Sequence, residues 1–147
     1  MSLREHERAH MARSVALLLE GAPEDVRDHV VQRLSSVVSG RTRKLTVSLR
    51  QSVVLALGQL GDCDEDAADV ALRRALVRSL KDPDPQVQNF TIVSMGLVGA
   101  RVDTDEGADR AAAKELRKQL SNQLATGKSR RAWAGVAIGL MERGFVE

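Results

Sequence analysis

The stretch that decides the fold is RQSVVLALGQLG, residues 50–61, because it returns twice further along the chain. The segments QNFTIVSMGLVG at 88–99 and RAWAGVAIGLME at 131–142 align with it without gaps. Their shared glycines are 38 and 43 positions apart, and a fainter copy at 12–20 lies 38 positions before the first. This period is typical of two-helix solenoid repeats. The sequence therefore predicts a chain built from stacked helix pairs.

A second helical pattern follows the three earlier copies of this segment, with apolar residues at 3.6-residue spacing. The residues that this spacing places toward a core are Val26, Val30, Val31, Leu34, Val37, Val38, Leu72, Leu76, Val77, Leu80, Ala112, Leu116, Leu120 and Leu124. We predict seven helices, at about 5–20, 24–38, 43–60, 65–81, 85–98, 106–125 and 129–143. Paired, they make three hairpins and the first helix of a fourth.

Glycine and proline punctuate these segments as helix ends require. Gly21, Gly40, Gly61, Gly99 and Gly144 follow or close the helices, where a left-handed residue is common. Pro23 and Pro85 stand where helices begin, because the missing N–H is not needed there. Both features favour the same helix boundaries as the apolar spacing.

The composition of the 147 residues points to an all-α fold. Aromatic residues make up only 2% of the chain, although 43% of it is hydrophobic. A β-sandwich or barrel draws on aromatic and β-branched residues, whereas Leu, Val and Ala suit packed helices. A single cysteine excludes a disulfide framework, and no apolar run is long enough to span a bilayer. The net charge of +2 is no strong argument for nucleic acid.

The first full repeat resembles a known family. Residues 49–62, the Leu80-Lys81-Asp82 that ends the next helix, and Asp84-Pro85 with Val87 are similar to bacterial HEAT repeats, including the short type named after phycobilisome lyases. Gln88 departs from the pattern, since Arg is common there. The resemblance implies a right-handed α-α superhelix of about three and a half hairpins, and scaffolding or protein binding.

We expect one domain, 1–147, cut from a longer protein, with repeats at about 5–39, 43–82, 84–125 and 129–147. Glycine inside a helix is unfavourable, so Gly58, Gly96 and Gly139 need a reason. A glycine at one height of each first helix allows a neighbouring helix to approach closely. We predict that all three are buried at helix–helix contacts.

Several short motifs suggest chemistry but are incomplete. His6-Glu7-Arg8-Ala9-His10 matches a zinc-protease motif, but it lies among charges and lacks a third ligand. Residues 62–66 begin like a calcium loop, but Ala67 and Arg73 replace the required Gly and Glu. Gly127-Lys128-Ser129 lacks the preceding strand and first glycine of a phosphate loop. Cys63 has no nearby partner for catalysis, and we predict no metal, cofactor or catalytic site.

Four basic residues at matched positions of two predicted helices form a candidate binding site. Aligning Leu76 with Leu116 places Arg74 beside Lys114 and Arg78 beside Lys118, and each pair is spaced i,i+4 on one helix face. A solvated face with basic helix ends is the favoured explanation of this stripe, and a groove for an anionic partner is the alternative. Such a partner would be an acidic peptide or a nucleic-acid backbone.

The resemblance to HEAT repeats implies a protein-interaction or scaffolding module that binds a protein or peptide on the concave face built by 24–38, 65–81 and 106–125. A nucleic-acid-binding domain is the alternative, and a lyase-like or zinc-dependent enzyme comes third. The last helix is apolar on several sides, which predicts self-association or a missing repeat. No membrane contact is expected, no signal fixes a compartment, and the cytoplasm is favoured.

Overall fold

The computed structural model describes residues 3–40, 45–102 and 107–144, with side chains between residues 10 and 143 of these ranges. The described residues are all-helical. They form α1 (Leu3–Leu18), α2 (Glu24–Ser39), α3 (Val47–Leu60), α4 (Ala67–Ser79), α5 (Pro85–Gly99), α6 (Gly107–Thr126) and α7 (Arg131–Gly144). The prediction of seven helical segments is confirmed, with boundaries displaced by up to about four residues.

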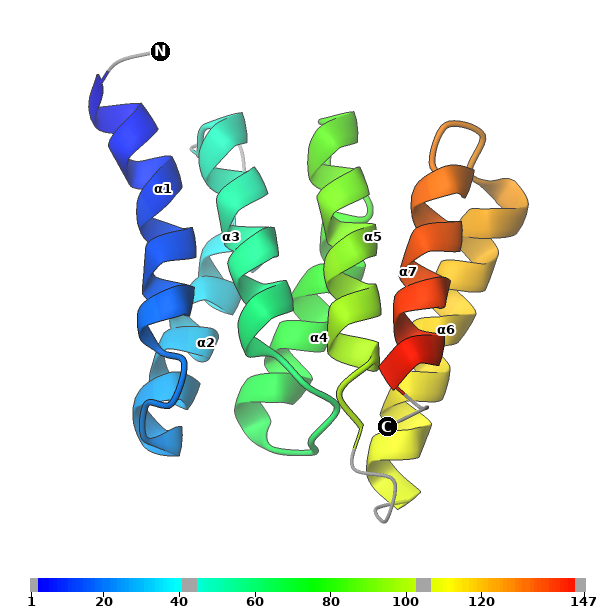
Figure 1. Ribbon diagram of the computed structural model, residues 1–147. Helices are drawn as coiled ribbons and strands as arrows, with labels where there is room; N and C mark the ends of the chain where they lie inside the picture. The colour runs from blue at the N-terminus through cyan, green and yellow to red at the C-terminus, as the bar shows by residue number, and fades with distance from the viewer. Residues whose placement is uncertain (1–2, 41–44, 103–106, 145–147) are drawn as a thin grey trace.

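The helices lie in two layers. Helices α1, α3, α5 and α7 stand side by side in chain order in the front layer, with α1 at one end and α7 at the other (Figure 1). Helices α2, α4 and α6 lie behind them, and α2 packs against α4. Each described helix contacts its sequence neighbour or the helix two places away, so the packing is local along the chain.

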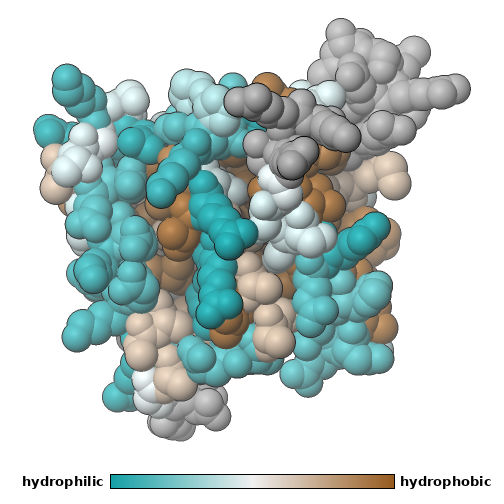
Figure 2. All heavy atoms as spheres, turned by 180° about the vertical axis from the view of Figure 1, so that it is seen from behind, coloured by the Kyte–Doolittle hydropathy of each residue, from teal (hydrophilic) through white to brown (hydrophobic). Residues whose placement is uncertain are grey.

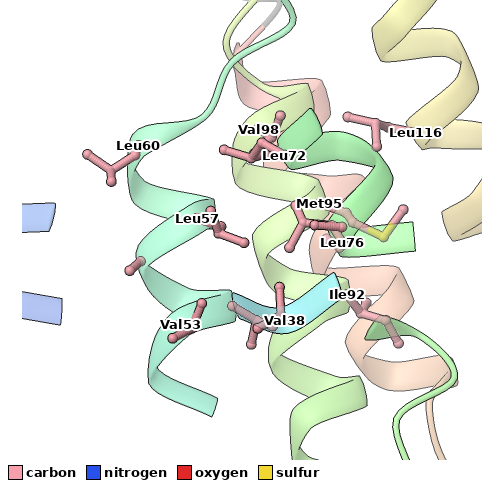
Figure 3. Packing of buried hydrophobic residues seen from close by; sticks show 14 of the residues in the cluster. Val38, Val53, Leu57, Leu60, Leu72, Leu76, Ile92, Met95, Val98 and Leu116 are labelled. Carbon is pink, nitrogen blue, oxygen red and sulfur yellow. The ribbon is translucent and has the colours of Figure 1, made fainter. Parts of the chain in front are cut away.

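The core lies between these layers and is almost entirely aliphatic. Leu57 of α3, Leu72 and Leu76 of α4, and Met95 of α5 are fully buried and point toward one another (Figure 3). Trp133 is only partly buried and packs against the edge of this cluster, as expected for a core residue rather than a stacking platform. The prediction of core residues is confirmed for most positions, which are buried or partly buried. It is wrong at Val26 and Leu124, which are 44% and 42% exposed.

Side-chain caps explain where three helices begin. Thr46, Asp66 and Asp84 each accept a hydrogen bond from the backbone N–H three residues later. Helix α4 therefore begins at Ala67, two residues later than predicted. At the other ends, among the described residues Gly21 alone has a positive φ, of 81°. The left-handed interpretation is wrong at Gly40 and Gly61, whose backbones are extended, and at Gly99, which lies inside α5 without a positive φ.

Two of the three repeated glycines lie at close helix contacts, and the third does not. A Cβ on Gly58 would lie 2.7 Å from Cα of Ser94, and one on Gly96 would lie 2.7 Å from the backbone oxygen of Ala137. Gly139 is exposed and has nothing within 4 Å. The prediction is confirmed for α3 and α5 but wrong for α7, because no described helix follows α7 in the front layer.

A buried ion pair ties α3 to the turn between α4 and α5. Nε and an Nη of Arg50 donate to the two carboxylate oxygens of Asp82, at 2.8 and 3.1 Å, and the other Nη donates to the Leu45 carbonyl. Both side chains are at least nine-tenths buried. Asp82 also accepts from the Asp84 N–H. The pair is fully hydrogen-bonded, as a buried charge must be.

Candidate functional site

A groove of about 420 Å³ lies between α4 and α6. Its apolar lining comes from Val70 and Val77 on α4 and from Ala112 and Leu116 on α6. The polar lining consists of Glu65, Arg73, Arg74, Arg78, Glu115 and Gln119. The groove therefore combines an aliphatic floor with charged walls of both signs.

The groove exists because α4 and α6 are spaced apart. Helix α4 packs closely against α2, but it makes few contacts with α6, which packs on α5 and α7 instead. Partly buried side chains such as Val77 thus keep an accessible face. Figure 2 shows hydrophobic surface between hydrophilic rows on the α2–α4–α6 side.

The arginines of this groove differ in what they contact. Arg73 is engaged by its own helix start: it donates to the carbonyls of Asp62 and Asp64 and pairs with Glu65. Arg74 and Arg78 are exposed, and within the described residues neither has an ion-pair or hydrogen-bond partner. These two guanidiniums, one turn apart, are the free cations that a ligand in the groove would meet.

The other two residues of the predicted stripe do not line this groove. Lys114 lines a shallow hollow of about 150 Å³ on another side of α6, with Arg110, Arg117 and Met141. Lys118 is exposed and lies 3.9 Å from Glu115. The structure brings Arg74 and Arg78 together in one site and leaves Lys114 and Lys118 outside it.

The separation has a geometric reason. Helices at equivalent positions of the repeat have the same orientation. The side of α4 that faces α6 is therefore not equivalent to the side of α6 that faces α4. Arg74 and Arg78 on α4 therefore stand opposite Glu115 and Gln119 rather than opposite their own counterparts. Sequence alignment identifies equivalent positions, but a groove between helices is lined by non-equivalent ones.

A second charged cluster surrounds the C-terminal end of α3. Arg27 of α2 donates to the Leu60 carbonyl and to the carboxylates of Asp28, Asp62 and Asp69. Asp69 is fully buried and also accepts the Asp62 N–H. Burial raises the pKa of Asp69 to about 7. Burial lowers the pKa of Arg27, but its three carboxylate neighbours outweigh burial and raise it.

This cluster contains the described acidic residues best placed to surround a cation. Carboxylate oxygens of Asp28, Asp66 and Asp69 lie within 4.8 Å of one another. Two of them already accept from the Arg27 guanidinium, and Asp66 caps α4 through the Asp69 N–H. The guanidinium thus supplies the positive charge that these carboxylates need. Of residues 62–66, which begin like a calcium loop, Asp66 therefore serves as the N-cap of α4.

Arg101 is a structural residue that the sequence patterns missed. It follows α5 and donates to the carbonyls of Gly58 and Gly61, at 3.1 and 2.7 Å, closing the end of α3. Burial lowers its pKa. Its partners are 43 and 40 residues away, so no local pattern could have identified this contact.

Cys63 lies beside this cluster and is fully buried, with its thiol donating to the Val98 carbonyl at 3.5 Å. Burial raises the pKa of the thiol to about 12, so it is protonated and unreactive near neutral pH. The side chains of His6 and Glu7 in the zinc-protease motif lie outside the described residues. Lys128 and Ser129 lie in the turn before α7, after the buried Gly127.

Comparison with known proteins adds no family assignment. No protein-family model matches the chain, and no curated protein matches it at a significant level. Among the helices of the described ranges, none has the length and apolar character to cross a membrane.

Proposed function

We propose that this chain is a HEAT-like solenoid segment that binds a protein or peptide in the groove between α4 and α6. The two-layer stacking, the matched glycines at Gly58 and Gly96, and the resemblance of residues 49–62 to HEAT repeats support the architecture. Fold alone does not fix function, so the proposal rests on the groove.

The observation that carries the proposal is the pair of unpaired arginines above an aliphatic floor. Arg74 and Arg78 attract acidic groups, while Val70, Val77 and Ala112 offer apolar surface. A free carboxylate or phosphate reaching these guanidiniums would gain charge-assisted hydrogen bonds. Glu115 on the opposite wall disfavours a uniformly acidic ligand. A peptide segment with acidic residues beside an aliphatic residue fits this lining.

Nucleic acid is the alternative occupant, through the same two arginines. Single-stranded nucleic acid is commonly held by stacking of bases on exposed aromatic rings. Phe90 and Trp133 are instead partly buried and packed against the core. The placement of these two side chains, the only aromatic ones among the described residues, supports the peptide over the nucleic acid.

The test begins with a display library of short peptides selected on the wild-type chain. Enriched peptides are then titrated against wild type, the double variant Arg74→Glu/Arg78→Glu and the control Lys114→Glu/Lys118→Glu. We expect at least a tenfold loss of affinity in the first variant, about 1.4 kcal/mol, and near wild-type affinity in the second. All four side chains are exposed, so both variants should fold.

Comparison of the two double variants distinguishes binding in the groove from a general effect of charge. Equal weakening in both variants would show that net charge, rather than the groove, attracts the peptide. Retained binding in Arg74→Glu/Arg78→Glu would place the site elsewhere. A duplex and a single-stranded DNA titrated at two salt concentrations test the alternative, since phosphate contacts weaken steeply with salt. Tight, salt-sensitive DNA binding without peptide enrichment would replace the peptide proposal by the nucleic-acid one.

A further inference from the structure

The two open ends of the front layer carry the two halves of one repeated contact. In the α3–α5 and α5–α7 contacts, a glycine on the side of one helix that faces the next helix meets a residue on the side of that next helix that faces back. Gly58 of α3 meets Ser94 of α5, and Gly96 of α5 meets Ala137 of α7. Ser94 and Ala137 are fully buried as a result.

The glycine half of this contact is unoccupied on α7. Gly139 aligns with Gly58 and Gly96, is exposed, and has nothing within 4 Å of its Cβ position. Gly135, one turn earlier, is equally open. Ala132 and Val136 lie on the same side, and Val136 is 55% exposed. The outer face of α7 is therefore flat and apolar around its two glycines.

The other half of the contact is unoccupied on α1. Leu18 aligns with Ser94 and Ala137, but it is 82% exposed where they are buried. Met11, two turns earlier, aligns with the buried Val87 and is 61% exposed. Leu17 and Val26 of α2 are also exposed, so this end holds four of the seven large hydrophobic side chains that are exposed among the described residues.

The two ends are complementary in shape. Figure 1 places α1 and α7 at opposite ends of the front layer, so the outer faces that carry Leu18 and Gly139 cannot meet within one molecule. Leu18 is larger than Ser94 or Ala137, and the absence of side chains at both Gly135 and Gly139 gives the space that a larger residue needs. Burying exposed leucine, methionine and valine side chains supplies a hydrophobic driving force.

We propose that the outer face of α7 binds the outer face of α1 of a second copy of this chain, with Leu18 seated over Gly139. The contact continues the internal α3–α5 and α5–α7 contacts into the next molecule. It joins two different surfaces, so each dimer keeps one free α1 face and one free α7 face, and head-to-tail chains can grow. It is independent of the groove between α4 and α6.

Two variants that block one end each test this contact. Leu18→Glu places a charge on α1 and leaves α7 intact, whereas Val136→Glu does the reverse. The association state is measured by sedimentation velocity over a concentration series, and circular dichroism confirms that each variant is folded. We expect the wild type to grow in mass with concentration, and each variant alone to stay at the 16.0 kDa of the monomer.

The decisive sample is the equimolar mixture of the two variants. Each supplies the face that the other lacks, so the mixture should form a discrete dimer that does not grow further. A wild type that remains monomeric at the highest concentration reached would overturn the proposal. So would a mixture that stays monomeric, or a Leu18→Glu variant that dimerises alone, which would indicate a two-fold contact through α7.

Discussion

Gly96 and Gly139 occupy the same position in successive front-layer helices, yet one is covered and the other is open. A Cβ on Gly96 would collide with the backbone of Ala137, whereas one on Gly139 would meet nothing within 4 Å. The difference shows that a repeat position specifies a contact only where the next helix is present. Two aligned residues, one in contact with the next helix and one exposed, can therefore be compared by making the same substitution at both. The difference in unfolding free energy measures the contribution of the contact.

The largest expected effect comes from Arg50, whose equivalent in α7 is Arg131. Arg50→Met leaves the buried Asp82 carboxylate without its partner, which should cost roughly 3–5 kcal/mol of unfolding free energy. Arg131 is exposed and donates only to the Ala125 carbonyl, so Arg131→Met should change stability by less than about 0.5 kcal/mol. Urea unfolding of both variants measures the contrast. Similar losses of unfolding free energy in the two variants would mean that the buried Arg50–Asp82 pair contributes no more to stability than the exposed Arg131.

A smaller loss is expected when a large side chain is placed at the covered glycine. Gly96→Leu should lower the free energy of unfolding by about 1–3 kcal/mol or more, because the obstruction is the Ala137 backbone rather than a flexible side chain. Gly139→Leu should melt close to the wild-type temperature at low protein concentration. Thermal unfolding followed by circular dichroism compares them. If Gly96→Leu melted like the wild type, α5 and α7 would not be in close contact.

The sequence predicted the parts of this structure that depend on local periodicity. The helices, their core-facing residues and the close approach at Gly58 and Gly96 follow from apolar spacing and internal alignment. The sequence did not predict that Gly139 is exposed, because an alignment of repeats does not show whether another helix packs against a given position. The contacts of Arg27 and Arg101 with the end of α3 span more than 30 residues and carry no local signal.

Only two of the four residues of the predicted basic stripe line the groove, for a related reason. Arg74 and Arg78 lie in the groove between α4 and α6, but their counterparts Lys114 and Lys118 do not line it. Alignment found chemically similar residues at equivalent positions. The groove instead joins one helix face to the opposite face of its neighbour, and that geometry requires the three-dimensional stack.

A third, more moderate effect is a change of stability with pH, and it arises in the charged cluster around the C-terminal end of α3. Burial and the neighbouring carboxylates raise the pKa of Asp64 to about 6, and burial raises that of Asp69 to about 7. Both values exceed the unfolded pKa of about 4, so between about pH 4 and 7 the folded chain binds more protons than the unfolded chain. The stability contributed by these two groups is therefore present at about pH 4 and is lost as pH rises toward 7.

The variant Asp64→Asn isolates part of this effect, because it removes one titrating group from the exposed edge of the cluster. Urea midpoints at about pH 5 and 7.5 should differ less in this variant than in the wild type. A midpoint of the wild type that rises with pH over this range would show that the carboxylates are held ionised, with lowered pKa values.

The smallest effect is also the sharpest test of the opening contrast, because the same substitution should have opposite signs at the two glycines. Alanine is favoured over glycine in a helix by about 0.5–1 kcal/mol. At Gly139 nothing opposes this preference, so Gly139→Ala should raise the free energy of unfolding by that amount. At Gly96 a Cβ would lie 2.7 Å from the Ala137 oxygen and 2.8 Å from its Cα, so α5 and α7 must separate. Gly96→Ala should therefore destabilise the chain despite its better helix propensity. Urea unfolding at low protein concentration keeps self-association out of the measurement, and equal signs at the two positions would contradict the distinction between a covered and an open face.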